Sequence, residues 1–346
     1  MDRLRPAPPA RTSDRSLPVR ESRHPAILLA LVISLTVSAC QGSSSSSFSS
    51  AGRSRAISPG SGSLAFSGGS SGTQGKFLVV AGENFWGSIA TQLAGGKAQV
   101  RSIIVNPETD PHSYTSTASD GRLIAQSAIA IVNGVGYDNW ASQSLAASPS
   151  SSRVVVNVGD LLALKQGENP HRWYFPASVY AVVNQIVADY DKLDPADAAY
   201  FARQKQSFET RGLARYNQLR QEIRAKYAGV PVGYSESIFQ GLGQDLGLKL
   251  LTPYRFTKAI AEGTDVTAAD KQTVERQAQS RQIKVWVYNR QNITPDVQRV
   301  TSAANARHIP SATITETLSP ASDSFEQWQV AQLRVLRSAL HRATGR

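Results

Sequence analysis

The sequence predicts an α/β protein built as two lobes with parallel-rich sheets, joined by one long rigid helix. Segments rich in β-branched residues alternate with segments of helical periodicity in both halves of the chain, which is typical of parallel α/β units. The chain has 346 residues, whereas a single core usually stops growing at about 250. Between the halves, a helical pattern of about 30 residues exceeds the usual length of a globular helix.

Both lobes show the same alternation of strands and helices. The N-terminal lobe is predicted for residues 76–194 and the C-terminal lobe for residues 229–346. Strand-like segments of the first lobe are KFLVVAG, AQVRSIIV, IAIVNGVG and RVVVNVG, and those of the second are VPVGYSE, LKLLTP, IKVWVYN and PSATITE. Helical patterns separate these segments, so the strands of each lobe are expected to pair in parallel. A final helix is predicted from Asp323 to His341.

The connecting helix is predicted for residues 195–228. Asp194 and Pro195 form a helix start signal, and the segment from Gly229 to Pro231 forms a stop signal. Large apolar side chains recur between them at helical spacings: Phe201, Phe208, Tyr216, Leu219, Ile223 and Tyr227. Such a helix spans roughly 45 Å at 1.5 Å per residue. A coiled coil is the alternative, but the short length and Gly212 favour a strut shared by two lobes.

The first 40 residues resemble a bacterial lipoprotein signal peptide. A basic stretch precedes an apolar run at residues 26–37, which is too short to cross about 30 Å of hydrocarbon comfortably. The signal ends in VSAC, which is similar to a lipobox, and Cys40 is the only cysteine of the chain. We expect Cys40 to be the lipid anchor on the outer face of the cell membrane, with an inert thiol as the alternative. Residues 41–75, nearly all Ser, Gly and Ala, are expected to form a disordered tether.

The basic charge of the chain does not indicate a nucleic-acid partner. The formal net charge is +11, and removal of the first 40 residues, with six Arg and three acidic residues, lowers it to about +8. Basic residues are scattered on helical patterns, and no basic run is interleaved with aromatic residues as a nucleic-acid groove requires. Mild attraction to an anionic membrane surface explains this net positive charge better than nucleic-acid binding does. We expect a monomer.

His112 occupies a loop between an apolar strand pattern and a helix start. Thr117 and Asp120 have capping-box spacing, so the loop lies at the carboxyl end of a strand, where open parallel sheets bind ligands. Asp110 and Pro111 should hold the loop stiffly. A single loop histidine is more often solvated or structural than a ligand, so a metal site requires partners.

The candidate partners of His112 are one histidine and two glutamates. His171 also follows a proline-stiffened turn, and Glu236 and Glu316 end strand patterns of the second lobe. Each glutamate alone is more often an ordinary exposed or helix-start carboxylate. Together, two imidazoles and two carboxylates form an N₂O₂ set that neutralises a divalent cation. The other histidines are predicted to lie outside this set, in the signal or on the surface: His24, His308 and His341.

The order of motifs resembles a known family, the extracytoplasmic solute-binding proteins (cluster A-I) of ABC transporters for zinc, manganese or iron. The similar segments are VVAGENFWGSIATQLAGG, DPHSYTSTASD, IVNGVGYDNW, NPHRWYFP, YSES, VYNRQ and IPSATITETLSP. The resemblance covers residues 76–340. It implies two α/β lobes bridged by one rigid helix, with metal ligands at His112, His171, Glu236 and Glu316.

The resemblance also implies a receptor that delivers its ion to a membrane permease with a separate ATPase; this chain has no G-x-x-x-x-G-K-[ST] loop. Glu236 stands where zinc-dedicated members often have His, the His-rich loop of those members is absent, and Phe175 stands where an Asp often follows the NPH motif. Two carboxylates favour manganese or ferrous iron, yet zinc binds N₂O₂ sets tightly. Zinc and manganese both remain candidates, with iron less favoured.

Two other functions are compatible with parts of the sequence. A metallohydrolase could use the same four residues, but catalytic zinc normally has three protein ligands, and H-E-x-x-H and G-x-S-x-G motifs are absent. A surface adhesin fits the tether but does not need the four ligands. Asn289 and Gln291 are left outside the site, because a turn-forming Asn is as plausible as one that orients ligands. We expect metal binding to weaken below about pH 6.5 as the histidines protonate.

Overall fold

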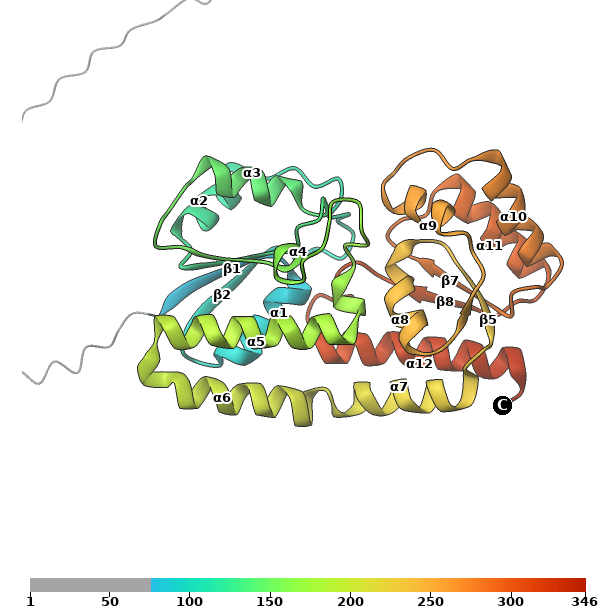
Figure 1. The fold of residues 1–346 in the computed structure, drawn as a ribbon. Coiled ribbons are helices and arrows are strands. Elements are labelled where there is room, and N and C mark those ends of the chain that lie inside the picture. Colours follow the sequence, from blue (N-terminus) through green and yellow to red (C-terminus); the bar gives the residue numbers. More distant parts are fainter. Residues whose placement is uncertain (1–75) are drawn as a thin grey trace, which may run out of the picture. The chain divides into compact units, whose positions relative to one another are not determined.

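The computed structural model describes residues 76–346. The predicted signal at residues 1–40, its Cys40 and the predicted tether at residues 41–75 lie outside the described residues. The described part contains two parallel four-stranded sheets with helices on both faces (Figure 1). The predicted α/β class is confirmed.

The N-terminal lobe follows the predicted alternation of strands and helices. Its elements are β1 (Phe77–Glu83), α1 (Asn84–Ala94), β2 (Ala98–Ile104), α2 (Ala118–Gln126), β3 (Ile129–Val132), α3 (Asn139–Ala147), β4 (Val154–Asn157), α4 (Val158–Leu161), a 3-10 turn (Arg172–Tyr174) and α5 (Pro176–Leu193). The strands lie in the order β2, β1, β3, β4, and every pair is parallel. All four strands therefore end at the same edge of the sheet.

The C-terminal lobe repeats this topology. Its elements are β5 (Pro231–Tyr234), a 3-10 turn (Ser237–Phe239), α8 (Gln240–Asp245), β6 (Lys249–Leu250), α9 (Tyr254–Ala261), α10 (Ala268–Gln279), β7 (Val285–Asn289), α11 (Pro295–Ala306), β8 (Ser311–Ile314) and α12 (Phe325–Thr344). The strands lie in the order β6, β5, β7, β8, again all parallel. Both sheets therefore have the same strand order: the second strand of each lobe lies at one edge, followed by the first, the third and the fourth.

Alternation of side chains along β1 explains how helices cover both faces of the first sheet. Val79 and Ala81 pack in the largest apolar cluster, with residues of α1 and α5. Val80, on the opposite face, packs in a smaller cluster with Ile124 of α2 and Trp140 of α3. Successive strand residues point to opposite faces, so one buried strand feeds both clusters. The largest cluster continues through the connecting helices into the C-terminal lobe.

The connecting segment is helical over almost its predicted length but is not one uninterrupted α-helix. A 3-10 turn (Pro195–Asp197) leads into α6 (Ala198–Ser207), a π-helical turn (Phe208–Gly212) follows, and α7 (Ala214–Tyr227) ends the segment. The Leu213 amide donates to the Phe208 carbonyl at 2.8 Å, the i to i+5 bond of a π turn. Residues five apart lie about 140° apart on a regular α-helix. The wider π turn brings these two side chains closer to one face, and both are buried.

Helix α12 forms a second connection between the lobes, which the sequence analysis did not predict. At its N-terminal end, the Phe325 amide donates to Ser88 Oγ at 2.9 Å, and Gln92 donates to Glu326 Oε2 at 2.9 Å. Both partners lie on α1 of the N-terminal lobe. Farther along, α12 runs beside α7 (Figure 1). Within residues 76–346, none of the helices has the length and apolar character needed to cross a bilayer.

Candidate metal centre

The four predicted ligands come together at the carboxyl ends of strands from both lobes. His112 lies in the loop between β2 and α2, and His171 directly precedes the 3-10 turn Arg172–Tyr174. Glu236 and Glu316 follow the last residues of β5 and β8 by two positions. Parallel sheets place ligand sites at this edge because their loops converge there. Residues 204 positions apart in the chain, His112 and Glu316, are thereby brought to one place.

Hydrogen bonds shape the loop of His112 on both sides. The His112 amide donates to Asp110 Oδ1 at 3.0 Å. Thr117 and Asp120 form both halves of the predicted capping box at the start of α2, and Tyr114 Oη donates to Asp120 at 2.8 Å. The prediction of the cap is confirmed. His112 Nε2 is buried and has no hydrogen-bond partner among the described residues.

Asn169 orients the imidazole of His171. Its Oδ1 lies 3.0 Å from the His171 amide nitrogen and 2.8 Å from His171 Nδ1. An amide oxygen only accepts, so Nδ1 carries the proton and Nε2 keeps its lone pair for a metal. The Asn169 Nδ2 group donates to the Ser237 carbonyl at 2.8 Å and to Gln240 Oε1 at 2.9 Å, both in the C-terminal lobe. Asn169 therefore positions a ligand and joins the two lobes.

One amide holds both carboxylates. Asn289 Nδ2 donates to Glu236 Oε2 at 2.9 Å and to Glu316 Oε1 at 2.8 Å. The second oxygen of Glu316 accepts a bond of 3.0 Å from Tyr137 Oη. The second oxygen of Glu236 has no hydrogen-bond partner among the described residues and lies 3.6 Å from His171 Nε2. Both glutamates are at most 1 % exposed, so neither is the ordinary surface carboxylate considered from the sequence.

The spacing of the ligand atoms fits a single ion. One ligand atom from each of the four residues lies within 4.8 Å of the others. In a tetrahedral shell with bonds of about 2.1 Å, ligand atoms lie about 3.4 Å apart. His171 Nε2 is already 3.6 Å from an oxygen of Glu236 and from one of Glu316. The widest pairs would close by little more than about 1 Å to complete that shell.

Burial determines the protonation states of the four candidate ligands. Burial lowers the pKa of His112 and of His171 to about 4, so both imidazoles stay neutral and able to ligate well below neutral pH. Burial raises the pKa of Glu316 to about 7, and burial with the nearby Glu316 charge raises the pKa of Glu236 well above its ordinary value. The expectation that binding weakens below about pH 6.5 through histidine protonation is therefore wrong. The carboxyl proton of Glu316, which an ion must displace, titrates nearer neutral pH.

A small hollow leads from the surface to His112. Its volume is about 120 Å³, and it lies between loops of the N-terminal lobe and helix α9. Lys258 of α9 crosses its rim and donates to the Gly167 carbonyl at 3.1 Å. Glu168 and Glu262 also line it. Side chains of both charge signs therefore line the hollow that contains His112.

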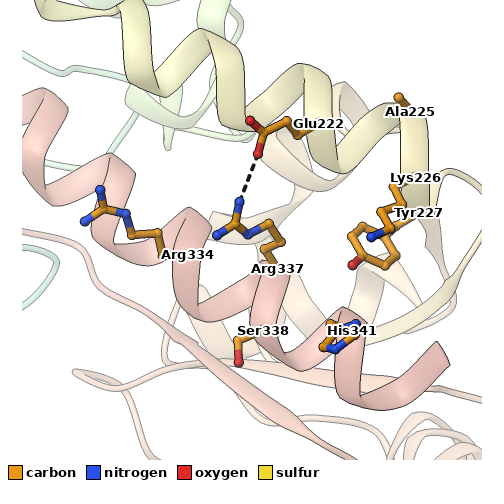
Figure 2. A pocket seen from close by; sticks show the side chains of 8 residues that line it. All are labelled: Glu222, Ala225, Lys226, Tyr227, Arg334, Arg337, Ser338 and His341. Carbon is orange, nitrogen blue, oxygen red and sulfur yellow. Dashed lines mark hydrogen bonds and ion pairs between the residues drawn. The ribbon is translucent and has the colours of Figure 1, made fainter. Parts of the chain in front are cut away.

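A more voluminous hollow lies elsewhere, between α7 and α12 (Figure 2). It is an open groove of about 770 Å³, and none of its lining residues belongs to the four candidate ligands. Arg337 in this groove is paired with Glu222 at 2.9 Å. Among the described residues, two further histidines, His308 and His341, are exposed, as predicted, and neither belongs to the cluster of candidate ligands.

The family model described as zinc-uptake complex component A (ZnuA), periplasmic, matches residues 79–339. The chain belongs to this family. The resemblance inferred from the motifs is thereby confirmed, and the zinc-uptake component family consists of metal-binding proteins of transport systems.

Individual relatives bind different metals. The manganese-binding lipoprotein MntA of Halalkalibacterium halodurans is 24% identical over 179 residues, a match that covers 49% of this chain and only 57% of that relative. A manganese-bound periplasmic metal-binding protein from Candidatus Liberibacter asiaticus has a TM-score of 0.66 at 18% identity, covering 77% of this chain and 100% of that one. The periplasmic zinc-binding protein TroA of Treponema pallidum gives 0.63 at 18%, covering 78% and 99%. These structures show the shared fold.

Sequence reasoning missed the groups that position the four candidate ligands. Asn169, Tyr137 and Asn289 all bond directly to one or more of them. Gln291 contacts the site through the backbone, because its Oε1 accepts from the Glu316 amide and its Nε2 donates to a carbonyl in the loop that precedes His112. For Asn289 and Gln291, the signal was their place at the end of a strand pattern. Tyr137 carried no such signal.

Proposed function

We propose that this chain captures a divalent transition metal ion outside the cell and delivers it to an ABC transporter permease whose ATPase is a separate polypeptide. The ion is zinc or manganese, with ferrous iron less favoured. The observation that carries the proposal is the convergence of two histidines and two glutamates, whose ligand atoms lie within 4.8 Å of one another. Membership of the zinc-uptake component family supports it.

The chemistry of the four side chains suits capture of a cation. His112 and His171 are neutral at physiological pH and present unpartnered Nε2 atoms. Glu236 and Glu316 are buried beside each other, which is unfavourable until a positive charge arrives between them. A divalent ion would neutralise both carboxylates and bond to both imidazoles. Because two ligands come from each lobe, the ion would also hold the lobes together.

Entry and release would occur at the His112 side of the site. The hollow of about 120 Å³ is lined by His112 and by residues of both lobes, whereas His171, Glu236 and Glu316 are at most 1 % exposed. Separation of the lobes at this rim would break the Lys258 bond to the Gly167 carbonyl and expose the ion to a permease. The connecting helices and α12 link the lobes on the other side, so small movements are expected rather than wide opening.

The protein would be held at the membrane by its N-terminus. Lipidation of Cys40, after removal of the signal, would anchor it to the outer face, and residues 41–75 would form the tether to the folded part. This arrangement keeps a monomeric receptor close to its permease. Labelling with radioactive palmitate, lost in Cys40→Ser, would test the anchor.

Binding and delivery, rather than catalysis or adhesion, account for the arrangement of the site. A catalytic metal needs an open position for water, whereas four protein ligands form a closed shell. Adhesion would not need buried ligands at all. The absence of turnover of ester and peptide substrates by the metal-loaded protein would support a receptor.

Titration of the purified, metal-stripped protein tests the proposal. Calorimetry with Zn²⁺, Mn²⁺ and Fe²⁺ should give one ion per chain. His112→Ala and Glu236→Ala each remove a ligand and should weaken binding by more than the roughly 10–100-fold typical of changes outside the ligand shell. His308→Ala, at an exposed histidine, is the matched control. No 1:1 binding in wild type, or unchanged affinity in both ligand variants, would refute metal capture.

A further inference from the structure

The net positive charge of the folded part is concentrated on one set of helices. Residues 76–346 contain 29 basic and 23 acidic residues, a net charge of +6. The segment from α6 through α7, residues 198–227, together with α12, contains ten basic and three acidic residues, a net charge of +7. The other described residues comprise 19 basic and 20 acidic ones, a net charge of −1. The excess positive charge therefore belongs to these helices, which we call the α6–α7–α12 face.

The helices of the α6–α7–α12 face lie together on one side of the folded part. In Figure 1, α6 and α7 follow one another along the lower edge, and α12 packs beside α7. The hollow at His112 is lined by loops and by α9, which lies in the upper part of the same view. The basic helices and the route to the candidate metal centre are thus on opposite sides.

The carboxylates of the α6–α7–α12 face leave most of its basic side chains uncompensated. Glu209 pairs with Lys205 at 3.0 Å, and Glu222 reaches across the groove between α7 and α12 to pair with Arg337 at 2.9 Å (Figure 2). Six basic residues of this face are exposed and form no ion pair with another residue of the described part: Arg203, Arg211, Arg224, Lys226, Arg334 and Arg342.

The groove between α7 and α12 offers donors that suit phosphate oxygens. Lys226 lines it from α7 and Arg334 lines it from α12, and Ser338 adds a hydroxyl group (Figure 2). Ammonium and guanidinium groups form charge-assisted hydrogen bonds with phosphate. The groove is open rather than enclosed, and the other uncompensated side chains extend along both α6 and α7. An extended array of phosphates fits this arrangement better than one small anion does.

We propose that the α6–α7–α12 face docks on the surface of a membrane that contains anionic phospholipids. The choice of this partner rests on the proposed function, in which Cys40 anchors the chain to a membrane. A Gly/Ser-rich tether of 35 residues, 41–75, has a root-mean-square length of about 30–35 Å, so lipid headgroups stay within reach of the folded part. Each Lys or Arg near an anionic surface strengthens attachment by about fivefold.

Docking by this face orients the receptor for capture. The hollow at His112 then points away from the lipid, toward the medium that supplies the ion. Delivery to a permease in the membrane requires the folded part to leave this orientation. Attachment through exposed charges permits such turning, because it is screened by salt and involves no insertion of apolar side chains.

Vesicle binding by the folded part tests the proposal. Residues 76–346 belong to one compact unit that contains both sheets, so they can be studied without the predicted signal and lipid. Co-sedimentation measures the partition coefficient on vesicles of phosphatidylcholine alone and on vesicles that also contain one-third phosphatidylglycerol. The salt concentration is kept at roughly 0.1 M, where the Debye length is about 10 Å.

The test variant combines Arg203→Gln, Lys226→Gln and Arg334→Gln, with one substitution on each helix of the face. None of these three side chains forms a hydrogen bond or an ion pair within residues 76–346, so their replacement should not affect folding. The matched control replaces two arginines and one lysine that are equally exposed and equally free of such bonds within the described part. It combines substitutions in α2, in the loop before His171 and in α10: Arg122→Gln, Lys165→Gln and Arg276→Gln.

Wild type should bind the anionic vesicles and not the neutral ones. The test variant should partition about 100-fold less, as expected for three charges at about fivefold each. The control variant should stay within about threefold of wild type, because charges farther than a Debye length from the lipid are screened. Salt near 1 M, where the Debye length is about 3 Å, should abolish binding of wild type.

A fluorescent label reports which face meets the lipid. Cys40 is the only cysteine of the chain, so residues 76–346 accept a single labelled cysteine without interference. Gln221 in α7 and Gln272 in α10 are both exposed. A label at Gln221→Cys should be quenched by lipids that carry a nitroxide on the headgroup, and a label at Gln272→Cys should not.

Several outcomes would overturn the docking surface. These are equal partitioning of the test and control variants, equal binding to neutral vesicles, and equal quenching at both labels. Stronger binding of soluble poly-glutamate than of anionic vesicles would identify a surface for acidic protein and would also overturn it. Metal titration of the same proteins separates this result from metal capture, because none of the substituted residues belongs to the four candidate ligands. If vesicle binding fails while one ion still binds, metal capture stands; if vesicles bind and no ion does, metal capture alone fails.

Discussion

Replacement of Asn169 by Ala tests how much the orientation of His171 contributes to metal binding. Asn169 makes four hydrogen bonds: two through Oδ1 to His171 and two through Nδ2 to Ser237 and Gln240. Ala removes all four. The imidazole would then be free to rotate and to place its proton on Nε2, the atom that is expected to bind the ion. The contact between the lobes at Ser237 would be lost at the same time.

The expected size of the effect follows from these bonds. Loss of the group that orients a ligating histidine typically weakens metal binding by about 10–100-fold. At about 1.4 kcal/mol per tenfold, this equals roughly 1.4–2.8 kcal/mol. The metal-free protein should also lose stability, because four bonds of about 0.5–1.5 kcal/mol each are removed. We expect about 2–4 kcal/mol, since the freed groups regain part of this energy by bonding to water.

The assay compares zinc affinity and melting temperature in wild type and Asn169→Ala. Asn217→Ala is the control, because Asn217 is a partly exposed amide of α7 that donates to Tyr180 Oη at 3.1 Å. Nitrogen NMR of the imidazole should show the proton of His171 on Nδ1 in wild type and a mixture of tautomers in the variant. A folded Asn169→Ala protein that binds zinc within about twofold of wild type would refute the role given to this bond.

Three further predictions concern protonation and the packing of the lobes. The metal-free protein should become less stable as pH rises above the ordinary carboxyl range, because burial raises the pKa of Glu83 well above its ordinary value, so that the folded state holds a proton that the unfolded state has already lost; a melting temperature that rises with pH there contradicts this. Glu83→Gln, whose side chain stays neutral, should stabilise the protein at pH 8 by about 1–3 kcal/mol and reduce the dependence of stability on pH. Glu108→Gln, at an exposed position, is the control and should do neither. Gly241→Ala should destabilise by about 1–3 kcal/mol in denaturant unfolding, because its Cβ would lie 2.4 Å from the Phe175 ring; Gly121→Ala, with open space, is the control, and equal stability of the two variants would refute the clash.

The histidines with lowered pKa values and the carboxyl groups with raised pKa values affect stability in different pH ranges. The predicted loss of stability with rising pH therefore has a definite sign. A carboxyl group with a raised pKa contributes stability below its unfolded value, and this contribution is lost as pH rises through the folded value. His112 and His171 have lowered pKa values near 4, so they reduce stability only as pH falls from about 6.5 toward 4. Above pH 6.5 these two imidazoles no longer contribute to the pH dependence of stability, whereas the raised carboxyl pKa values still do.

The fold and the four candidate ligands could be predicted from local pattern. Alternating β-branched and helical segments indicate parallel sheets in any context, and both sheets have the parallel pairing expected. His112, Glu236 and Glu316 were found because each follows or ends a strand pattern, and parallel strands bring such positions to one edge, whereas His171 was marked by its proline-stiffened turn. His112 was further marked by its cap, whose hydrogen bonds span only three residues.

The contacts that position these ligands could not be predicted in this way. Tyr137 bonds to Glu316 across 179 positions of sequence, and no spacing or periodicity relates the two. The path of the connecting segment is similar: the π turn joins Phe208 and Leu213, which are both buried in the assembled core, and the helical spacing of the segment did not indicate it. Such features depend on which segments pack against one another in the folded protein. The residue pattern of one segment does not identify the segments that will pack against it.

The amino-acid sequence by itself determined the class of the fold and the side chains that could bind a metal, because backbone periodicity, capping and ligand chemistry are local properties, and the order of its motifs indicated the family. The tertiary structure alone decided three other features. It moved the pKa of each imidazole to about 4 through burial, and it placed Asn169 between His171 and the opposite lobe. It also set one amide, that of Asn289, against both carboxylates. These features depend on dielectric surroundings and on distances between segments, which exist only once the two lobes have packed together.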